Sequence, residues 1–147
     1  MQTESQVVAL GHVIQLAVAP VFLLTGVSGL LGVLTNRLAR IIDRARYLEE
    51  RSARVGEGGE QERIHQELRL LSHRARLINT AVSLCTLCAL LICAVIVALF
   101  VAAFLVTNVT LVIGLIFTAA MLALFSGLVS FLREIYVATR SLRIGPH

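Results

Sequence analysis

The chain has 147 residues, of which 57% are hydrophobic and 15% are charged, and its formal net charge is +4. A soluble domain of this length cannot bury so much apolar surface, so the composition excludes an ordinary soluble protein and favours a single membrane domain, residues 1–147. The excess of arginine does not indicate a nucleic-acid partner, because Tyr47 is the one aromatic residue among the arginines of residues 35–78 and aromatic platforms for bases are missing.

The first predicted transmembrane helix covers residues 7–34. This run has no charged residue and is longer than the about 20 residues that a helix needs to cross a bilayer. Pro20 removes one helical hydrogen bond and predicts a kink. One face of this helix is more polar than the others, and four of its residues are candidates for lining a pore: Gln15, Phe22, Gly26 and Gly29.

A charged segment follows at residues 35–78, with a turn signal at Gly56-Glu57-Gly58-Gly59 in its middle. On both sides of the turn, apolar residues recur at the three-four spacing of one helical face. This pattern predicts an antiparallel helical hairpin whose two apolar stripes face each other. No stop signal precedes the segment, so we expect the first transmembrane helix to continue into it as one rod.

The hairpin carries ten of the 13 basic residues, and all of these are arginine. Three of them near the first transmembrane helix would form a basic vestibule if several copies assemble: Arg37, Arg40 and Arg44. Asp43 is the one acid among them. We expect it either to centre an ion-pair network with Arg46, Arg74 and Arg76 or to coordinate an ion.

Two further transmembrane helices are predicted at residues 79–106 and 110–132, joined by a short uncharged turn. Each carries small residues every four positions, which let helices approach closely in lipid. The predicted packing residues are Ala94, Ala98, Ala102, Ala119, Ala123 and Gly127. A helical tail at about residues 133–143 ends before Gly145 and Pro146.

The positions of the arginines predict the topology, because basic residues accumulate on the cytoplasmic side of membrane proteins. The hairpin and the tail would both be cytoplasmic, and the N-terminus would lie outside. The predicted fold class is therefore an all-α integral membrane protein of the bacterial inner membrane. It has three transmembrane helices, the first two of which extend into a cytoplasmic antiparallel hairpin.

Residues with reactive side chains show no catalytic arrangement. Cys85 and Cys88 have the CxxC spacing but lie inside an apolar run, where cysteine packs as a small hydrophobic residue. His65 and His73 lie too far apart for a helical metal site with i, i+4 spacing. We therefore expect no enzymatic activity, cofactor or metal.

Several residues of the hairpin carry a resemblance to a known family. They are Asn36, Arg37, Arg40, Asp43, Arg44, Ala45, Arg46, Leu48, Leu68, Leu71, Arg74, Ala75, Arg76 and Ile78. With this pattern the chain resembles the bacterial family catalogued as domain of unknown function 2721. The resemblance implies a small membrane protein with a charged hairpin between its transmembrane helices, and it implies no activity or site residue.

Two functions fit this sequence. One is a homo-oligomeric ion channel, in which rings of arginine below the pore would favour anions. The alternative is a structural or adaptor protein whose hairpin binds anionic lipid headgroups or an unknown cytoplasmic protein. Both place the chain in the lipid bilayer.

Overall fold

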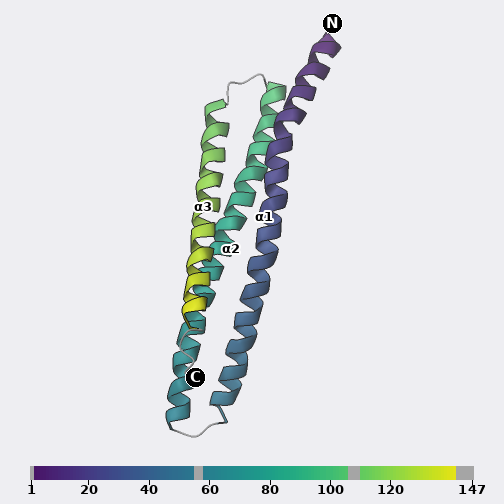
Figure 1. Ribbon diagram of the computed structural model, residues 1–147. Helices are drawn as coiled ribbons and strands as arrows, with labels where there is room; N and C mark the ends of the chain where they lie inside the picture. Colours follow the sequence, from purple (N-terminus) through teal and green to yellow (C-terminus); the bar gives the residue numbers. More distant parts are fainter. Residues whose placement is uncertain (1, 55–57, 106–109, 142–147) are drawn as a thin grey trace. The chain divides into compact units, whose positions relative to one another are not determined.

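The computed structural model describes residues 2–54, 58–105 and 110–141, and these ranges are almost entirely helical. Helix α1 spans Gln2–Ser52, α2 spans Gly59–Leu105 and α3 spans Thr110–Ser141 (Figure 1). The prediction that the first transmembrane helix continues without a break into the charged segment is confirmed, because α1 has 51 residues and contains Pro20 in its interior. Helix α2 likewise joins the second charged arm to the second apolar run.

The ends of the helices have local chemical causes. Helix α2 begins at Gly59 and carries Glu60 and Glu62 in its first turn, where acids are stabilised by the helix dipole. Helix α1 carries Arg51 in its last turn, where a cation is favoured. The predicted turns at Gly56-Glu57 and 107–109, and the predicted stop at Gly145 and Pro146, lie outside the described residues.

All three helices are long and apolar enough to span a membrane, as the sequence predicted. The most apolar windows have mean hydropathies of 2.1, 3.1 and 2.4, and only 17–22% of each window is buried inside the protein. Soluble proteins rarely expose such large apolar surfaces, so hydrocarbon or other protein must cover them. The structure therefore has the character of a multi-pass membrane protein.

The chain divides into two compact units, and each of the three helices contributes to both. The first unit contains residues 1–31 and 84–125. Its core holds small and branched side chains at three-four spacing, because these fit where helices pack closely. The buried residues of this unit are Ala17, Pro20, Val27, Cys85, Cys88, Ile92, Val95, Ala120 and Ala123.

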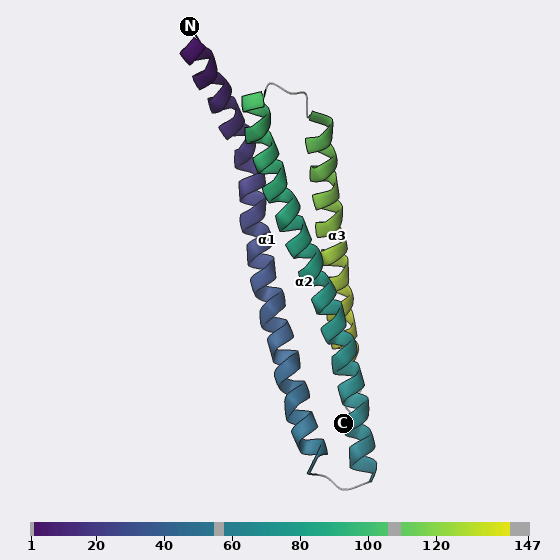
Figure 2. The ribbon, with the colours of Figure 1, turned by 180° about the vertical axis from the view of Figure 1, so that it is seen from behind.

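The second unit contains residues 32–83 and 126–147. In both views of the ribbon, the α1 segment from residue 32 and the α2 segment up to residue 83 lie side by side (Figures 1 and 2). Apart from Ala81, which is also buried, their buried residues recur every seven positions, the period at which one stripe of a helix keeps facing its neighbour. These residues are Leu34, Ile41 and Leu48 on α1 and Ile64, Leu71 and Ile78 on α2.

Candidate functional site

Charged side chains link α1 and α2 within the second unit at the same seven-residue interval as the core. Near the start of α2, Arg51 Nη2 lies 2.6 Å from Glu60 Oε1. Seven residues back along α1 and seven forward along α2, Arg44 Nη2 lies 2.9 Å from Glu67 Oε1. All four side chains are about half exposed, so water screens both pairs and each contributes little to stability.

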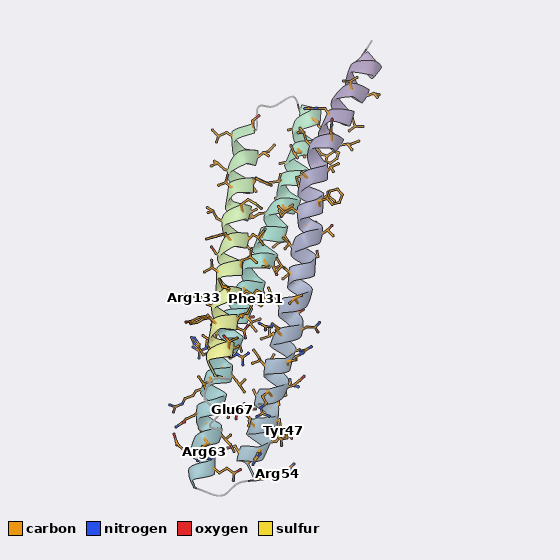
Figure 3. The ribbon with its side chains drawn as sticks, viewed as in Figure 1. Tyr47, Arg54, Arg63, Glu67, Phe131 and Arg133 are labelled. Atoms are coloured by element: carbon orange, nitrogen blue, oxygen red, sulfur yellow. The ribbon has the colours of Figure 1, made fainter. Side chains whose placement is uncertain are left out.

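The Arg51–Glu60 and Arg44–Glu67 pairs are accompanied by further effects on the two arginines. Glu60 accepts a hydrogen bond from Arg51 and attracts its charge, and both effects raise the pKa of Arg51. The guanidinium of Arg44 lies 5.8 Å from the centre of the Tyr47 ring, in addition to its hydrogen bonds to Glu67. Figure 3 shows Tyr47 and Glu67 on the neighbouring arms of the second unit.

One further step of seven brings two arginines together, Arg37 on α1 and Arg74 on α2, and the acid that joins them comes from α3. Arg37 Nη1 donates a hydrogen bond of 2.6 Å to Glu134 Oε2. Arg74 donates from Nε at 3.2 Å and from Nη2 at 2.9 Å to Glu134 Oε1. We call this group of three residues the Glu134 clamp.

Glu134 is the one polar or charged residue among the fully described side chains that is buried in the core, with an exposed side-chain fraction of 1%. It lies on α3 seven residues after Gly127 and fourteen after Ala120, which are both buried. The Glu134 carboxylate therefore lies on the buried face of α3, at the level of Arg37 and Arg74. Burying a carboxylate is costly unless charges and hydrogen bonds compensate it, and here both arginines do so.

A ring contact adds to the clamp. The Arg37 guanidinium lies 5.4 Å from the centre of the Phe131 ring, three residues before Glu134 on α3. A cation over an aromatic ring gains about 0.5–1 kcal/mol at partly exposed sites. Figure 3 shows Phe131 on the side of α3 toward α1, so the same helix holds Arg37 through its carboxylate and its ring.

The clamp lies at the edge of all three apolar runs. No charged residue occurs between Glu4 and Arg37, between Arg76 and the end of α2, or in α3 before Arg133. Beside the clamp, each helix contributes one exposed arginine for which no acidic partner is found among the described residues. We call Arg40, Arg76 and Arg133 the boundary arginines.

The predicted ion-pair network is placed differently in the structure. Arg74 pairs with Glu134 of α3 and not with Asp43 of α1. Asp43, Arg46 and Arg76 are exposed, and no ion pair joins them in the described part of the chain. The register between α1 and α2 explains the difference. The seven-residue steps that place Arg44 next to Glu67 also place Arg74 next to Arg37, and these two arginines need an acid to compensate their charges.

The predicted vestibule arginines do not share one environment. Arg37 belongs to the Glu134 clamp and Arg44 pairs with Glu67, whereas Arg40 is exposed. The predicted pore-lining residues are all exposed on α1, and a side chain added at Gly26 or Gly29 would meet no atom within 4 Å. These residues are Gln15, Phe22, Gly26 and Gly29.

Of the six predicted packing residues, Ala123 and Gly127 are buried. Ala98 and Ala102 are half-buried, and Ala94 and Ala119 are exposed. On α2 the buried stripe runs instead through Cys85, Cys88 and Ile92, so the two CxxC cysteines pack as hydrophobic residues while Cys93 is exposed. In the ranges 2–54, 58–105 and 110–141, no group of three metal-ligating side chains is close enough to hold a metal ion.

Sequence reasoning missed the role of Glu134. Its signal was present, because Glu134 is the one acid of residues 110–147 and follows Ala120 and Gly127 at seven-residue steps. An acid on an otherwise apolar or small stripe predicts a buried charge that needs a cationic partner. The partners come from two other helices, so spacing along α3 alone does not identify them.

These features define a class: a small all-helical protein with three helices able to span a membrane and a charged helical extension held by ion pairs. The model of the family described as "Protein of unknown function (DUF2721)" matches residues 17–144. The chain therefore belongs to this family, as the residues of the hairpin predicted. No curated protein and no solved structure matches the chain.

Proposed function

We propose that the protein is a structural membrane protein of the bacterial inner membrane whose charged hairpin, together with Arg133 of α3, binds anionic lipid headgroups on the cytoplasmic side. The observation that carries this proposal is the set of boundary arginines. Arg40, Arg76 and Arg133 come from three different helices, are exposed, and have no acidic partner among the described residues. Each lies close to the end of an apolar run, where guanidinium groups reach lipid phosphates while their stems lie along apolar surface.

The cytoplasmic placement follows from the charge distribution. Arginines cluster in residues 37–76 and again from residue 133, whereas residues 5–36 and 77–132 contain none. With basic residues inside, three transmembrane helices place the hairpin and the tail of α3 on the cytoplasmic side and the N-terminus outside. In this arrangement residues 35–78 form an antiparallel hairpin that projects from the membrane.

The ion pairs favour a structural role for the hairpin. Glu134 and Glu67 partly neutralise the charges of Arg37 and Arg44. This weakens the positive potential that a vestibule for anions would need. The same pairs tie α1 to α2 and, through the Glu134 clamp, to α3. A hairpin held together by these ion pairs would keep the boundary arginines at the level of the lipid headgroups.

Lipid retention by the full chain tests the proposal. Purified protein in mild detergent is titrated with phosphatidylglycerol, which is anionic, or phosphatidylcholine, which is zwitterionic, and bound lipids are counted by mass spectrometry of the intact complex. Since a basic residue near an anionic surface contributes about 1 kcal/mol, replacing Arg40, Arg76 and Arg133 by Gln is expected to weaken phosphatidylglycerol binding by more than about tenfold.

A matched control removes the same charge elsewhere. Arg54, Arg63 and Arg69 are also exposed, and along their own arms they lie further from the apolar runs: Arg54 is 14 residues beyond Arg40, and Arg63 and Arg69 are 13 and seven residues before Arg76, where seven residues of helix span about 10 Å. Replacing these three by Gln is expected to weaken binding by less than about threefold, because screening acts over about 8–10 Å. Equal losses in both variants, or no preference for phosphatidylglycerol in the unaltered protein, would contradict lipid binding at the boundary.

A second candidate is the homo-oligomeric ion channel, and one observation favours it. Gln15, Phe22, Gly26 and Gly29 are exposed on α1, as expected for residues that line a pore between copies. In this alternative Arg40 lies in the inner vestibule, and Arg40→Glu shifts the reversal potential of reconstituted protein away from anion preference. A protein that stays monomeric in lipid nanodiscs, or that carries no current, excludes the channel.

A further inference from the structure

The Glu134 clamp carries more positive than negative charge. Two arginines, each +1, surround one carboxylate of −1, so the group has a net charge of +1. Arg74 uses Nε and Nη2 on one carboxylate oxygen, and Arg37 uses Nη1 on the other. The remaining guanidinium nitrogens make no hydrogen bond to Glu134. The side chains of Arg37 and Arg74 are still 39% and 24% exposed, so both arginines remain accessible from outside.

The clamp also lies where phosphate groups are concentrated. Arg37 is the first charged residue after the uncharged run of α1, and Arg74 lies two residues before Arg76, the last charged residue of α2. In a bilayer, the layer next to the hydrocarbon contains the lipid headgroups. A headgroup phosphate therefore reaches this level without entering the apolar part of the membrane.

We propose that Arg37 and Arg74 form an oxyanion site that Glu134 fills from within the chain, and that the headgroup phosphate of an anionic phospholipid competes with Glu134 for it. This inference rests on the proposed function and adds a specific site to it. A phosphate diester carries the same charge as a carboxylate and accepts paired hydrogen bonds from a guanidinium. Because desolvation offsets much of the attraction in a buried ion pair, a ligand of equal charge at high local concentration competes with it.

Replacement of the Glu134 carboxylate by a lipid phosphate would change how α3 is held to α1 and α2. Among the described side chains of α3, Glu134 and Phe131 hold Arg37, and Glu134 holds Arg74. When a phosphate takes the place of the carboxylate, the end of α3 loses its ionic link to α1 and α2 in this unit. Glu134 thus acts as an internal competitor that sets how strongly the two arginines bind lipid.

The first experiment removes the competitor. In the lipid-retention assay with full-length protein, Glu134→Gln is expected to raise the affinity for phosphatidylglycerol about fivefold, the effect of one charge near an anionic surface, and to raise the affinity for phosphatidylcholine less, because its choline cation offsets the charge of the phosphate. The matched control is Glu67→Gln, which frees Arg44 one heptad further from the apolar runs, about 10 Å away. It is expected to change the affinity less than about twofold.

The second experiment asks whether the gain comes from the clamp. Adding Arg37→Gln and Arg74→Gln to Glu134→Gln is expected to abolish the gain completely. A gain that persists without the two arginines overturns the proposal, and so does a folded Glu134→Gln variant that gains no affinity. Circular dichroism checks the fold. Should Glu134→Gln not fold, Glu134→Asp replaces it, because the shorter acid loosens the clamp, and the absence of any gain in this variant also overturns the site.

The two proposals fail in different ways. The variant that lacks the boundary arginines keeps Arg37, Arg74 and Glu134. If that variant loses phosphatidylglycerol binding while Glu134→Gln gains none, lipid binding at the boundary stands and the clamp is purely structural. If the unaltered protein shows no preference for phosphatidylglycerol but Glu134→Gln acquires one that needs Arg37 and Arg74, the clamp stands alone as an oxyanion site.

Discussion

Arg37 and Glu134 lie 97 positions apart in the chain, yet Arg37 Nη1 is 2.6 Å from Glu134 Oε2. The contact joins the first charged turn after the apolar run of α1 to the first charged turn of α3, and Arg74 of α2 binds the other carboxylate oxygen. One buried acid thus links all three helices at the place where their apolar runs end.

Removing the buried carboxylate is expected to destabilise the protein more than removing an exposed one. Glu134→Ala leaves Arg37 and Arg74 facing each other without an anion and is expected to cost about 3–5 kcal/mol of unfolding free energy. Glu67→Ala opens an exposed pair and is expected to cost less than about 1 kcal/mol. Unfolding in mixed detergent micelles, followed by circular dichroism, measures both. Equal costs would show that the clamp is not the main ionic link.

The pairing of Arg44 with Glu67 is testable by exchanging their charges. Arg44→Glu places two acids opposite each other and is expected to lower the unfolding free energy by up to about 1 kcal/mol. The double variant Arg44→Glu/Glu67→Arg restores an opposite-charge pair and is expected to recover most of this loss. A double variant no more stable than the sum of its single changes would contradict the observed register.

The core of the second unit is expected to tolerate truncation poorly. Ile78 is fully buried, and Ile78→Ala is expected to cost about 2–5 kcal/mol through lost burial and a residual cavity. Leu70 lies on the same helix but is 52% exposed, so Leu70→Ala is the matched control and is expected to change stability by about 0.5 kcal/mol or less. Similar losses in both variants would mean that the buried stripe of α2 is assigned to the wrong face.

The three cysteines are expected to differ in reactivity. Cys85 and Cys88 are buried and Cys93 is exposed. Folded protein in detergent is expected to take up at most one N-ethylmaleimide per chain, at Cys93, which lies in the apolar run of α2 where detergent covers it, and Cys93→Ser is expected to take up none. Mass spectrometry of the intact chain counts the adducts, and unfolding in SDS provides the control with three. Two or more adducts on folded protein would contradict the packing of the first unit.

Much of the fold was predictable because lipid-spanning helices leave a strong signal. The apolar runs at residues 7–34, 79–106 and 110–132 and the turn signal at 56–59 predicted three transmembrane helices and their order. The absence of a stop signal predicted that α1 extends into the charged segment. The family also followed from the residues of the hairpin.

The partners of the charged residues were less predictable. Periodicity tells which side chains share a face of one helix, but an ion pair depends on the register between helices. Asp43 was expected to pair with Arg74 because both lie in the hairpin, whereas the acid that binds Arg74 comes from α3, whose register against α1 and α2 cannot be read from the pattern of any single helix. The small residues show the same limit, since Ala94 and Ala123 carry identical signals while only Ala123 is buried.

The proposed function requires the charged hairpin to lie on the cytoplasmic side, and the most direct measurement is the accessibility of position 58, where Gly58 is exposed. In a variant with Ala at the three cysteine positions and with Gly58→Cys, intact cells are treated with a membrane-impermeant maleimide before and after permeabilisation. Labelling only after permeabilisation is the predicted result. Labelling of Gly58→Cys in intact cells would place the hairpin outside and contradict the proposed topology.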